Sequence, residues 1–380
     1  MLEIMLEFVL YTAVFGVICW GALMLLPWCP WSTRENIEAP ALFESAVDLS
    51  DITVLIPARN EGPYIGHTLG GVKAQGANIR IIVIDDQSSD DTAEQAGRCG
   101  AQVLSGTAPP AGWSGKLWAL EQGLREVKTP YTLLLDADIE LTPGIIFELQ
   151  RKARDENLAL VSLMAEPPMD NFIERLLMPA FIFFFKLLYP FGLANKPESR
   201  IAAAAGGCIL VETQALHATG AFANLHNALI DDCTLADHIK HAGFRTFIGL
   251  SHAARSHRGY QTLKPIWEMV ARTAFTQLKY SVVLLAICTL IMTAMFWAAP
   301  LAFLLSSAQE AYMVSVAAWL AMFFTYVPTL IYYHRSPLWS LALPVIGTLY
   351  LAMTWTSALR YWRGERARWK DRHYESKANY

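Results

Sequence analysis

The sequence predicts an α/β protein in which a mostly parallel sheet forms a water-exposed domain between membrane-spanning helices. Two observations support this fold class. Short apolar runs alternate with helical patterns between Ile52 and Leu135, as in a parallel sheet with helical crossovers. Long apolar segments flank this region, and they raise the apolar content to 54%, which is too high for an ordinary soluble protein.

The central elements follow one another in a regular order. We expect strands at Ile52–Ile56, Arg80–Ile84, Gln102–Leu104 and Tyr131–Leu135. We expect helices at Ile65–Lys73, Thr92–Cys99 and Leu117–Val127. Parallel sheets bind ligands outside the carboxyl ends of their strands, so the loops at residues 57–61, 85–91 and 136–138 form the candidate binding region.

The N-terminal apolar segment, Phe8–Leu26, is about long enough to cross a bilayer. A signal peptide is the alternative, but Glu3 and Glu7 replace its usual basic region. The aromatic flank at residues 27–31 is typical of a membrane interface. We therefore expect a retained anchor within residues 1–30, followed by a water-exposed domain over residues 48–280.

The C-terminal region, residues 281–359, contains three further segments of spanning length. They are Ser281–Leu305, Ala311–Tyr333 and Leu338–Trp355. The tail at residues 360–380 is rich in Arg and Lys, which favours a cytoplasmic position. Three complete spans would place this tail opposite the preceding domain, so either one segment is broken or re-entrant, as Pro300 and Pro344 would allow, or the tail does not lie where its charge suggests.

One more apolar stretch, Phe172–Phe191, lies within the water-exposed domain. Glu174, Pro179 and Lys186 interrupt it, which disfavours a complete span. Two alternatives remain open. The segment is either a buried core helix or a helix in the membrane interface, with its phenylalanines in the acyl region.

The strand at Tyr131–Leu135 ends in two carboxylates, Asp136 and Asp138, and this is the most informative motif of the chain. A buried strand cannot carry two unpaired anions, so the pair belongs at its carboxyl edge, where a positive group must meet it. A divalent cation that also holds a diphosphate is a natural partner. The alternative is a helix cap, since Thr142-Pro143 is a good helix start.

Two further acidic pairs accompany this motif. Asp85-Asp86 follows the second expected strand, and Asp231-Asp232 precedes a helical stretch that ends at His241. Turn formation is the alternative interpretation of the first pair, and helix capping is that of the second.

The order of these motifs resembles that of family 2 glycosyltransferases. The matching segments are Ile56-Pro-Ala-Arg-Asn-Glu61, Ile84-Asp-Asp-Gln-Ser-Ser-Asp-Asp-Thr92, Gly115-Lys116, Asp136-Ala-Asp138 and Asp231-Asp232. The membrane-anchored branch that contains ceramide glucosyltransferases is similar. Within it, residues 112–120, 206–211 and 272–278 look like those of hopene-associated glycosyltransferases. The resemblance implies a GT-A fold, a nucleotide-sugar donor, a divalent metal (Mn or Mg) and a lipid acceptor.

The resemblance also implies roles for individual residues. Those expected to bind the nucleotide sugar are Pro57, Arg59, Asn60, Glu61, Asp85, Asp86, Lys116 and Asp136. Lys116 would neutralise a diphosphate oxygen. Asp138 would ligate the metal directly, and Asp136 would bind the ribose or the metal through water.

Asp232 and Arg272 are the expected catalytic residues. Asp232 would act as general base and take the proton of the acceptor hydroxyl. Adjacent side chains cannot both face one way, so we expect Asp231 to be structural. Arg272 would reach the diphosphate, with a lipid-headgroup anchor as its alternative. The chain lacks the Trp of the Gln-x-x-Arg-Trp motif of processive members, which disfavours polysaccharide synthesis.

The expected function is inverting transfer of a sugar to a membrane lipid such as a hopanoid or a ceramide-like lipid. The protein would be a multi-pass protein of the cell inner membrane with a cytoplasmic catalytic domain. One alternative is a polyprenyl-phosphate sugar synthase, whose phosphate acceptor needs no base. Another is a non-catalytic membrane scaffold that binds nucleotide sugar. No nucleic-acid partner is expected, because no basic stripe with interleaved aromatics occurs in the middle of the chain.

Overall fold

The computed structural model describes residues 2–43, 47–226, 228, 230–306, 308–365, 368–369 and 372–373. The chain divides into two compact units. The sheet unit contains residues 34–168, 191–259 and 366–380, and the helical unit contains residues 1–33, 169–190 and 260–365. Much of the expected basic tail, at residues 366–367, 370–371 and 374–380, lies outside the described residues.

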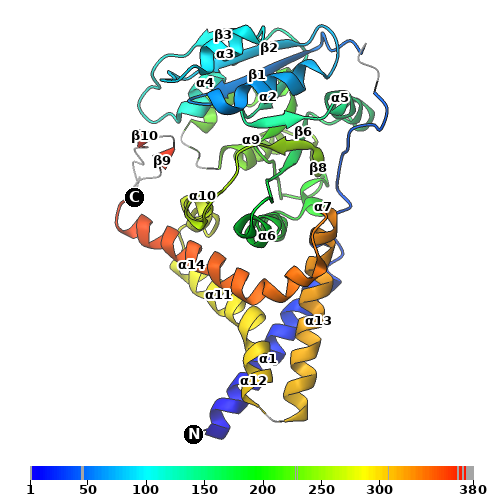
Figure 1. The fold of residues 1–380 in the computed structure, drawn as a ribbon, viewed down its shortest axis with the longest axis vertical. Helices are drawn as coiled ribbons and strands as arrows, with labels where there is room; N and C mark the ends of the chain where they lie inside the picture. The colour runs from blue at the N-terminus through cyan, green and yellow to red at the C-terminus, as the bar shows by residue number, and fades with distance from the viewer. Residues whose placement is uncertain are drawn as a thin grey trace. The chain divides into compact units, whose positions relative to one another are not determined.

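An eight-stranded sheet forms the centre of the sheet unit, in the order β3-β2-β1-β4-β7-β6-β8-β5 (Figure 1). The strands are β1 (Ile52–Ala58), β2 (Arg80–Asp85), β3 (Gln102–Ser105), β4 (Tyr131–Leu135), β5 (Ile139–Leu141), β6 (Leu160–Glu166), β7 (Cys208–Glu212) and β8 (Thr246–Ser256). Strands β3, β2, β1 and β4 are parallel, as expected. Strand β7 runs antiparallel to β4 and β6, and β5 runs antiparallel to β8.

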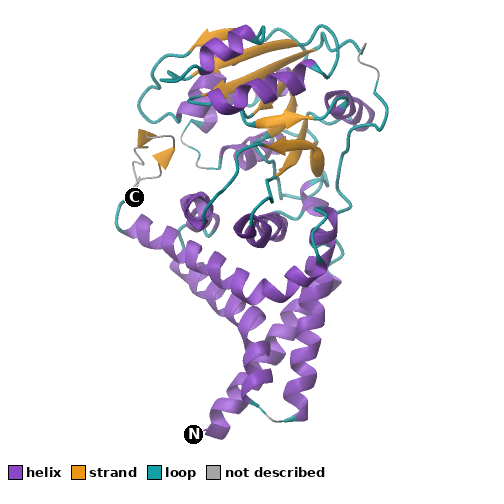
Figure 2. Cartoon of the chain, in the orientation of Figure 1, coloured by secondary structure: helices purple, strands orange, loops and turns teal. Residues whose placement is uncertain are grey.

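Helices cover both faces of this sheet (Figure 2). They are α2 (Gly62–Lys73), α3 (Thr92–Arg98), α4 (Gly115–Leu124), α5 (Ile145–Glu156), α7 (Phe191–Ala194), α8 (Thr213–Ala218), the 3₁₀ turn η1 (Ala221–Leu225) and α9 (Asp231–His241). Strand β1 shows why two cores form, because successive side chains of a strand point to opposite faces. Val54 and Ile56 pack in the core that contains α2 and α5, whereas Leu55 packs in the core that contains α4 and α9.

The helical unit consists of long apolar helices. They are α1 (Leu2–Leu25), α6 (Phe172–Leu188), α10 (Leu263–Gln277), α11 (Val282–Thr293), the π-helical turn η2 (Ala294–Ala298), α12 (Ala299–Leu305), α13 (Gln309–Tyr332), the 3₁₀ turn η3 (Pro337–Ala342) and α14 (Leu343–Trp362). A short antiparallel pair, β9 (Arg368–Trp369) and β10 (Arg372–His373), follows in the chain.

Four described stretches have the length and apolar composition of membrane spans. They are Phe172–Ala194, Val282–Leu305, Gln309–Tyr332 and Pro337–Trp362. The last three agree closely with the apolar segments expected near the C-terminus. The apolar part of α1, Val9–Leu25, is shorter than these stretches. Four long apolar helices of this kind indicate membrane association.

The stretch that begins at Phe172 is long and apolar enough to cross a membrane, but 56% of its apolar window is buried within the protein, which agrees with the buried-helix alternative. Its charges do not interrupt the helix, because they are buried within the helical unit: Glu174 is 1% exposed and Lys186 is 1% exposed. Glu174 accepts hydrogen bonds from the backbone amides of Asp170 and Tyr260, and Lys186 donates to the carbonyl of Ser32. Buried charges of this kind are tolerated when they are hydrogen-bonded.

The prolines alter the spanning helices without breaking them. Pro300 cannot donate to the preceding turn, and a π-helical turn precedes it at Ala294–Ala298. The carbonyl of Met295 in this turn accepts a hydrogen bond of 2.9 Å from the indole of Trp20. Pro344 lies in the first turn of α14, where the 3₁₀ turn η3 passes into α-helix. Each proline therefore lies beside a change of helix type, but neither proline breaks its helix.

Candidate active site

The carboxyl ends of β1, β2 and β4 meet at one edge of the sheet. The parallel register pairs Ala58 of β1 with Asp85 of β2, so the loops that follow these two strands are neighbours. Strand β4 lies on the other side of β1 and leads directly into Asp136. The structure thus brings together the three loops that the sequence placed at a common edge.

Hydrogen bonds join the loops after β1 and β2. The Arg59 guanidinium donates to the carbonyls of Asp86, at 2.6 Å, and Gln87, at 3.3 Å. The Asn60 side-chain oxygen accepts a 2.8 Å bond from the Ser89 amide. Arg59 and Asn60 therefore hold the two loops against each other. This cross-linking would keep the loop shape constant while a ligand binds.

The Asp85-Asp86 pair divides into two different environments. Asp85 Oδ1 accepts a 3.3 Å bond from the Ser88 amide, which matches the turn-forming alternative. Asp86 is 2% exposed, and its amide donates to the carbonyl of Ala58. Pro57 precedes this loop on β1 and borders the cavity described next. The nucleotide-binding role of these residues stays a prediction.

A small cavity of about 20 Å³ lies beside the end of β4, with room for about one water molecule. Four charged side chains from three elements line it, namely Lys116 of α4, Asp136 after β4, and Asp231 and Asp232 of α9. Lys116 Nζ lies 2.6 Å from Asp136 Oδ1. The side chains of Lys116 and Asp136 are 21% and 33% exposed, so solvent reaches the pair.

Asp232 is held by two backbone amides. Its Oδ2 accepts a 2.8 Å hydrogen bond from Gly206, and its Oδ1 accepts a 2.8 Å bond from Cys233. A Cβ atom on Gly206 would lie 3.4 Å from both Asp232 Oδ2 and Lys116 Nζ. A side chain at this position would therefore make ordinary van der Waals contact with the lysine and the carboxylate. Sequence reasoning assigned no role to Gly206, whose backbone amide holds Asp232.

The charges in this cavity shift one another's pKa values. Burial, and then the neighbouring charge of Asp231, raise the pKa of Asp232 to about 6. Burial also raises the pKa of Asp136; Lys116 opposes this rise and Asp138 adds to it. Burial acts to lower the pKa of Lys116, but Asp136, Asp231 and Asp232 outweigh it and raise the pKa above its ordinary value. Lys116 is therefore charged at neutral pH, and Asp232 exchanges its proton near neutrality.

Asp231 and Asp232 both border this cavity, and the different roles expected for them, base and structural partner, stay a prediction. They begin α9, and neither supplies a side-chain cap at the N-cap position, which is Ile230. Asp232 Oδ1 nevertheless accepts a hydrogen bond from the amide of Cys233 in the first turn, so Asp232 does satisfy one N-terminal amide of α9.

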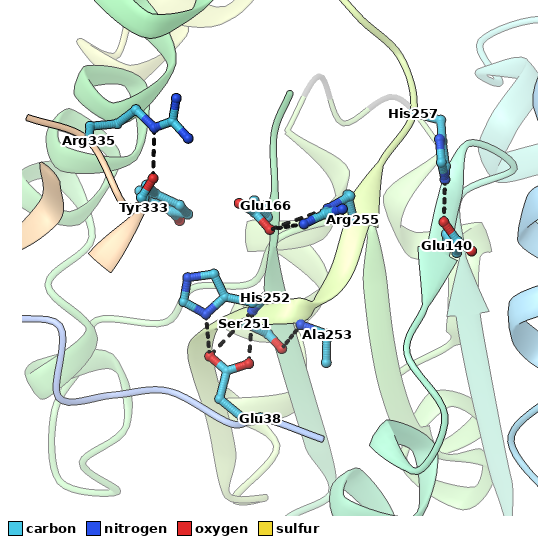
Figure 3. A network of polar contacts seen from close by, with 10 residues as sticks. All are labelled: Glu38, Glu140, Glu166, Ser251, His252, Ala253, Arg255, His257, Tyr333 and Arg335. Carbon is cyan, nitrogen blue, oxygen red and sulfur yellow. Dashed lines mark hydrogen bonds and ion pairs between the residues drawn. The ribbon is translucent and has the colours of Figure 1, made fainter. Parts of the chain in front are cut away.

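Asp138 is separated from Asp136 in the chain by the buried residue Ala137, and its contacts are different from those of Asp136. Its Oδ2 accepts hydrogen bonds from Ser256 Oγ, at 3.2 Å, and from Arg258 Nε, at 3.1 Å. Its carbonyl accepts a 2.9 Å bond from the His257 amide. The His257 ring instead faces Glu140, at 2.6 Å, beside the end of β8 (Figure 3).

Asp136 and Asp138 are the candidate ligands of a divalent cation. In the part of the chain that the structure describes, no three His, Cys, Asp or Glu side chains gather as a ready metal site. Mg²⁺ is commonly held by one or two carboxylates together with substrate phosphates. A metal role for Asp136 and Asp138, together with the diphosphate of a donor, stays a prediction.

Two arginines, Arg272 and Arg258, are not among the residues that line the cavity. Arg272 lies on α10 of the helical unit with an exposed side chain, so its catalytic role stays a prediction. Arg258 contacts both Asp138 and Glu61, whereas the sequence made it, like His257, only a weak candidate with a structural role expected. An isolated arginine after a strand has no distinguishing pattern, and its partners are far away in the chain.

The central region of the chain is similar to known proteins. Residues 53–220 match the family described as glycosyl transferase family 2. Two similar curated proteins are 4,4'-diaponeurosporenoate glycosyltransferases. The one from Staphylococcus haemolyticus is 35% identical over 116 residues, which cover 30% of this chain and 31% of the relative. The one from Staphylococcus aureus is 34% identical over 110 residues, covering 29% and 28%. The matched part thus spans about a third of these relatives.

A solved structure is similar over a longer stretch. It is the mannosyltransferase PcManGT from Pyrobaculum calidifontis in complex with GDP-Man and Mn²⁺, with a TM-score of 0.60 and 15% identity. The match covers 94% of this chain and 100% of that chain. At this identity the likeness concerns the fold, and it confirms the expected GT-A architecture.

Proposed function

We propose that this chain, in which residues 53–220 form a glycosyl transferase family 2 domain, transfers a sugar from a nucleotide-sugar donor to a membrane lipid. One observation carries the proposal. Lys116, Asp136 and Asp232 come from α4, β4 and α9 and meet at the carboxyl edge of the sheet, where a cation and a proton acceptor lie side by side. Ligands of open α/β sheets bind at this edge.

The donor half of the site would hold the nucleotide sugar through its charges. The cross-linked loops that contain Arg59, Asn60 and Asp86 would bind the base and ribose. Lys116 would turn from Asp136 toward a diphosphate oxygen, because a diphosphate offers it a larger negative charge. Asp138, with Asp136, would hold a Mn²⁺ or Mg²⁺ ion that enters with the diphosphate. Such a cation would supply Lewis-acid stabilisation of the leaving nucleoside diphosphate.

The acceptor half of the site centres on Asp232. Its ionised carboxylate would take the proton of an acceptor hydroxyl while that oxygen attacks the anomeric carbon. A pKa of about 6 suits this role, because the group is ionised at neutral pH and still binds a proton readily. The amides of Gly206 and Cys233 hold the carboxylate in position. One base acting in a single displacement would invert the configuration at the anomeric carbon.

The acceptor is proposed to be an apolar lipid, because four apolar helices of spanning length accompany the domain. The compound named for the staphylococcal relatives, 4,4'-diaponeurosporenoate, is also a lipid, but it is a carboxylate and belongs with the second candidate below. A hopanoid and a ceramide-like alcohol remain our proposals for the lipid class. The domain would lie on the cytoplasmic side of the inner membrane, because nucleotide sugars are made in the cytoplasm.

A second candidate is transfer to an acidic acceptor, such as a polyprenyl phosphate or a lipid carboxylate. This acceptor is already ionised and would need no base. The hydroxyl acceptor is our first candidate, because Asp232, with its raised pKa, could take the proton that such an acceptor must lose.

The test is transfer by the purified full-length protein. The protein would be incubated in detergent with a panel of nucleotide sugars labelled in the sugar, with and without extracted membrane lipids. The proposal requires that label enters the lipid phase only when lipids and a divalent cation are both present. Release of free sugar alone, or no turnover with any donor, would refute it.

A further inference from the structure

Arg258, which follows β8, connects two carboxylates at the edge of the sheet. Its Nε lies 3.1 Å from Asp138 Oδ2, and its terminal nitrogen lies 2.5 Å from Glu61 Oε2. The side chains of Asp138 and Glu61 are only 15% and 6% exposed. Anions removed from water in this way need a positive partner. Arg258 is a partner that the two carboxylates share.

The position of Arg258 is fixed by more than these ion pairs. Its guanidinium lies 5.1 Å from the centre of the Tyr64 ring, a cation–π distance. Its backbone amide donates to Ser256 Oγ, and this hydroxyl in turn donates to Asp138 Oδ2. Asp138 Oδ2 is therefore surrounded by protein donors, and a positive charge already lies against it. A divalent cation at the same oxygen would be repelled by the guanidinium.

We propose that Arg258 is the resident counter-cation of Asp138 and Glu61, and that a divalent cation displaces it from Asp138 only together with the donor's diphosphate. The inference rests on the proposed role of Asp138 as cation ligand. Without the diphosphate, the cation gains one carboxylate and must displace the arginine. With the diphosphate, it gains additional oxygen ligands, and the added negative charge offsets the repulsion. Cation and nucleoside diphosphate should therefore strengthen each other's binding by the same factor.

The test measures Mn²⁺ binding to the full-length protein in detergent, from the electron paramagnetic resonance signal of free Mn²⁺. Without nucleotide, Arg258→Gln should bind Mn²⁺ at least about tenfold more tightly than the unaltered protein, because two buried carboxylates lose their counter-charge. The matched control is Arg255→Gln. Arg255 precedes Arg258 by three residues and lies 3.3 Å from Glu166 on the neighbouring strand (Figure 3). This variant should leave Mn²⁺ affinity within about threefold, because Arg255 is paired with Glu166 and not with Asp138 or Glu61.

A second arm uses the unaltered protein with UDP or GDP as probes. The nucleoside diphosphate that the site accepts should raise Mn²⁺ affinity at least about tenfold. Tight Mn²⁺ binding without nucleotide would overturn the inference, and this arm decides the question even if Arg258→Gln does not fold. Unchanged or weaker Mn²⁺ binding by folded Arg258→Gln would also overturn it.

Neither arm depends on sugar transfer. A protein that binds Mn²⁺ as described but transfers no sugar would refute the proposed function alone. An active enzyme in which Arg258→Gln does not alter Mn²⁺ affinity would refute this inference alone.

Discussion

Replacing Asp232 by Asn tests the proposed base directly. Asn keeps the size of the side chain, but its single oxygen can accept from only one of the Gly206 and Cys233 amides, and it cannot take a proton. General-base catalysis contributes about 10²–10⁴-fold, so we expect kcat of Asp232→Asn to fall by about this factor. Binding of the nucleoside diphosphate should change little, because its proposed contacts are Lys116 and the cation held at Asp138.

The pH dependence follows from the raised pKa of Asp232. With a pKa of about 6, the carboxylate is ionised at pH 8 and only about one-tenth ionised at pH 5. kcat/KM of the unaltered enzyme should therefore fall about tenfold per pH unit below pH 6. The neighbouring charge of Asp231 contributes to the rise in pKa, so Asp231→Asn should move this acid limb to lower pH.

The same shift affects stability. The folded-state pKa of Asp232 lies above its ordinary value of 3.8, so the native state binds the proton more strongly than the unfolded chain. Its contribution to stability is present below pH 3.8 and is lost as the pH rises toward about 6. Asp232→Asn should remove this part of the pH dependence of thermal unfolding.

The assay is initial-rate transfer of labelled sugar into extracted lipid between pH 5 and 8, for the unaltered enzyme and each variant. Asp237→Asn is the matched control, because Asp237 lies on the same helix, pairs with His241 and is 45% exposed. Near-normal turnover by Asp232→Asn, or a flat pH profile, would refute the base assignment. Normal turnover in both Asp231→Asn and Asp232→Asn would favour an acidic acceptor.

Three further predictions concern the cation, the lysine and the helical unit. EDTA should abolish turnover and Mn²⁺ or Mg²⁺ should restore it, whereas Asp138→Asn should stay inactive with either ion; full activity in EDTA would exclude a metal role. Lys116→Gln should weaken nucleoside-diphosphate binding by about tenfold or more in calorimetry, because a charged hydrogen bond is lost, whereas the α5 control Lys152→Gln should bind normally. Tyr350→Phe should lower stability by about 1 kcal/mol in detergent unfolding, since it removes a buried 2.8 Å hydrogen bond to the Leu177 carbonyl; the exposed control Tyr361→Phe should have little effect.

The individual strands of the sheet could be predicted from the sequence, because each is specified by its own residues and those at its ends. Strand β2 was expected at Arg80–Ile84 and extends one residue further, to Asp85. The apolar run carries the strand signal, and the acidic residues mark its end. The same reasoning placed Asp136 at the carboxyl edge of the sheet, because a buried strand cannot carry an unpaired carboxylate.

Long-range pairings could not be predicted in this way. Strand β7 enters the sheet antiparallel between β4 and β6, and nothing in its own residues specifies that position. Arg258 pairs with Glu61 across 197 residues, and it resembles any solvated arginine in the sequence. The position of Asp231 and Asp232 at one cavity depends on where α9 begins relative to Lys116. A sequence pattern does not fix element boundaries to one residue.

The central claim is tested most directly by mass spectrometry of lipids from cells that express the chain. Cells carrying the unaltered protein and cells carrying Asp232→Asn, at matched expression in the membrane fraction, would be compared with cells that carry neither. The proposed function predicts a lipid heavier by one sugar residue in the first cells, strongly reduced in the second and missing from the third. The same lipid profile in all three would contradict it.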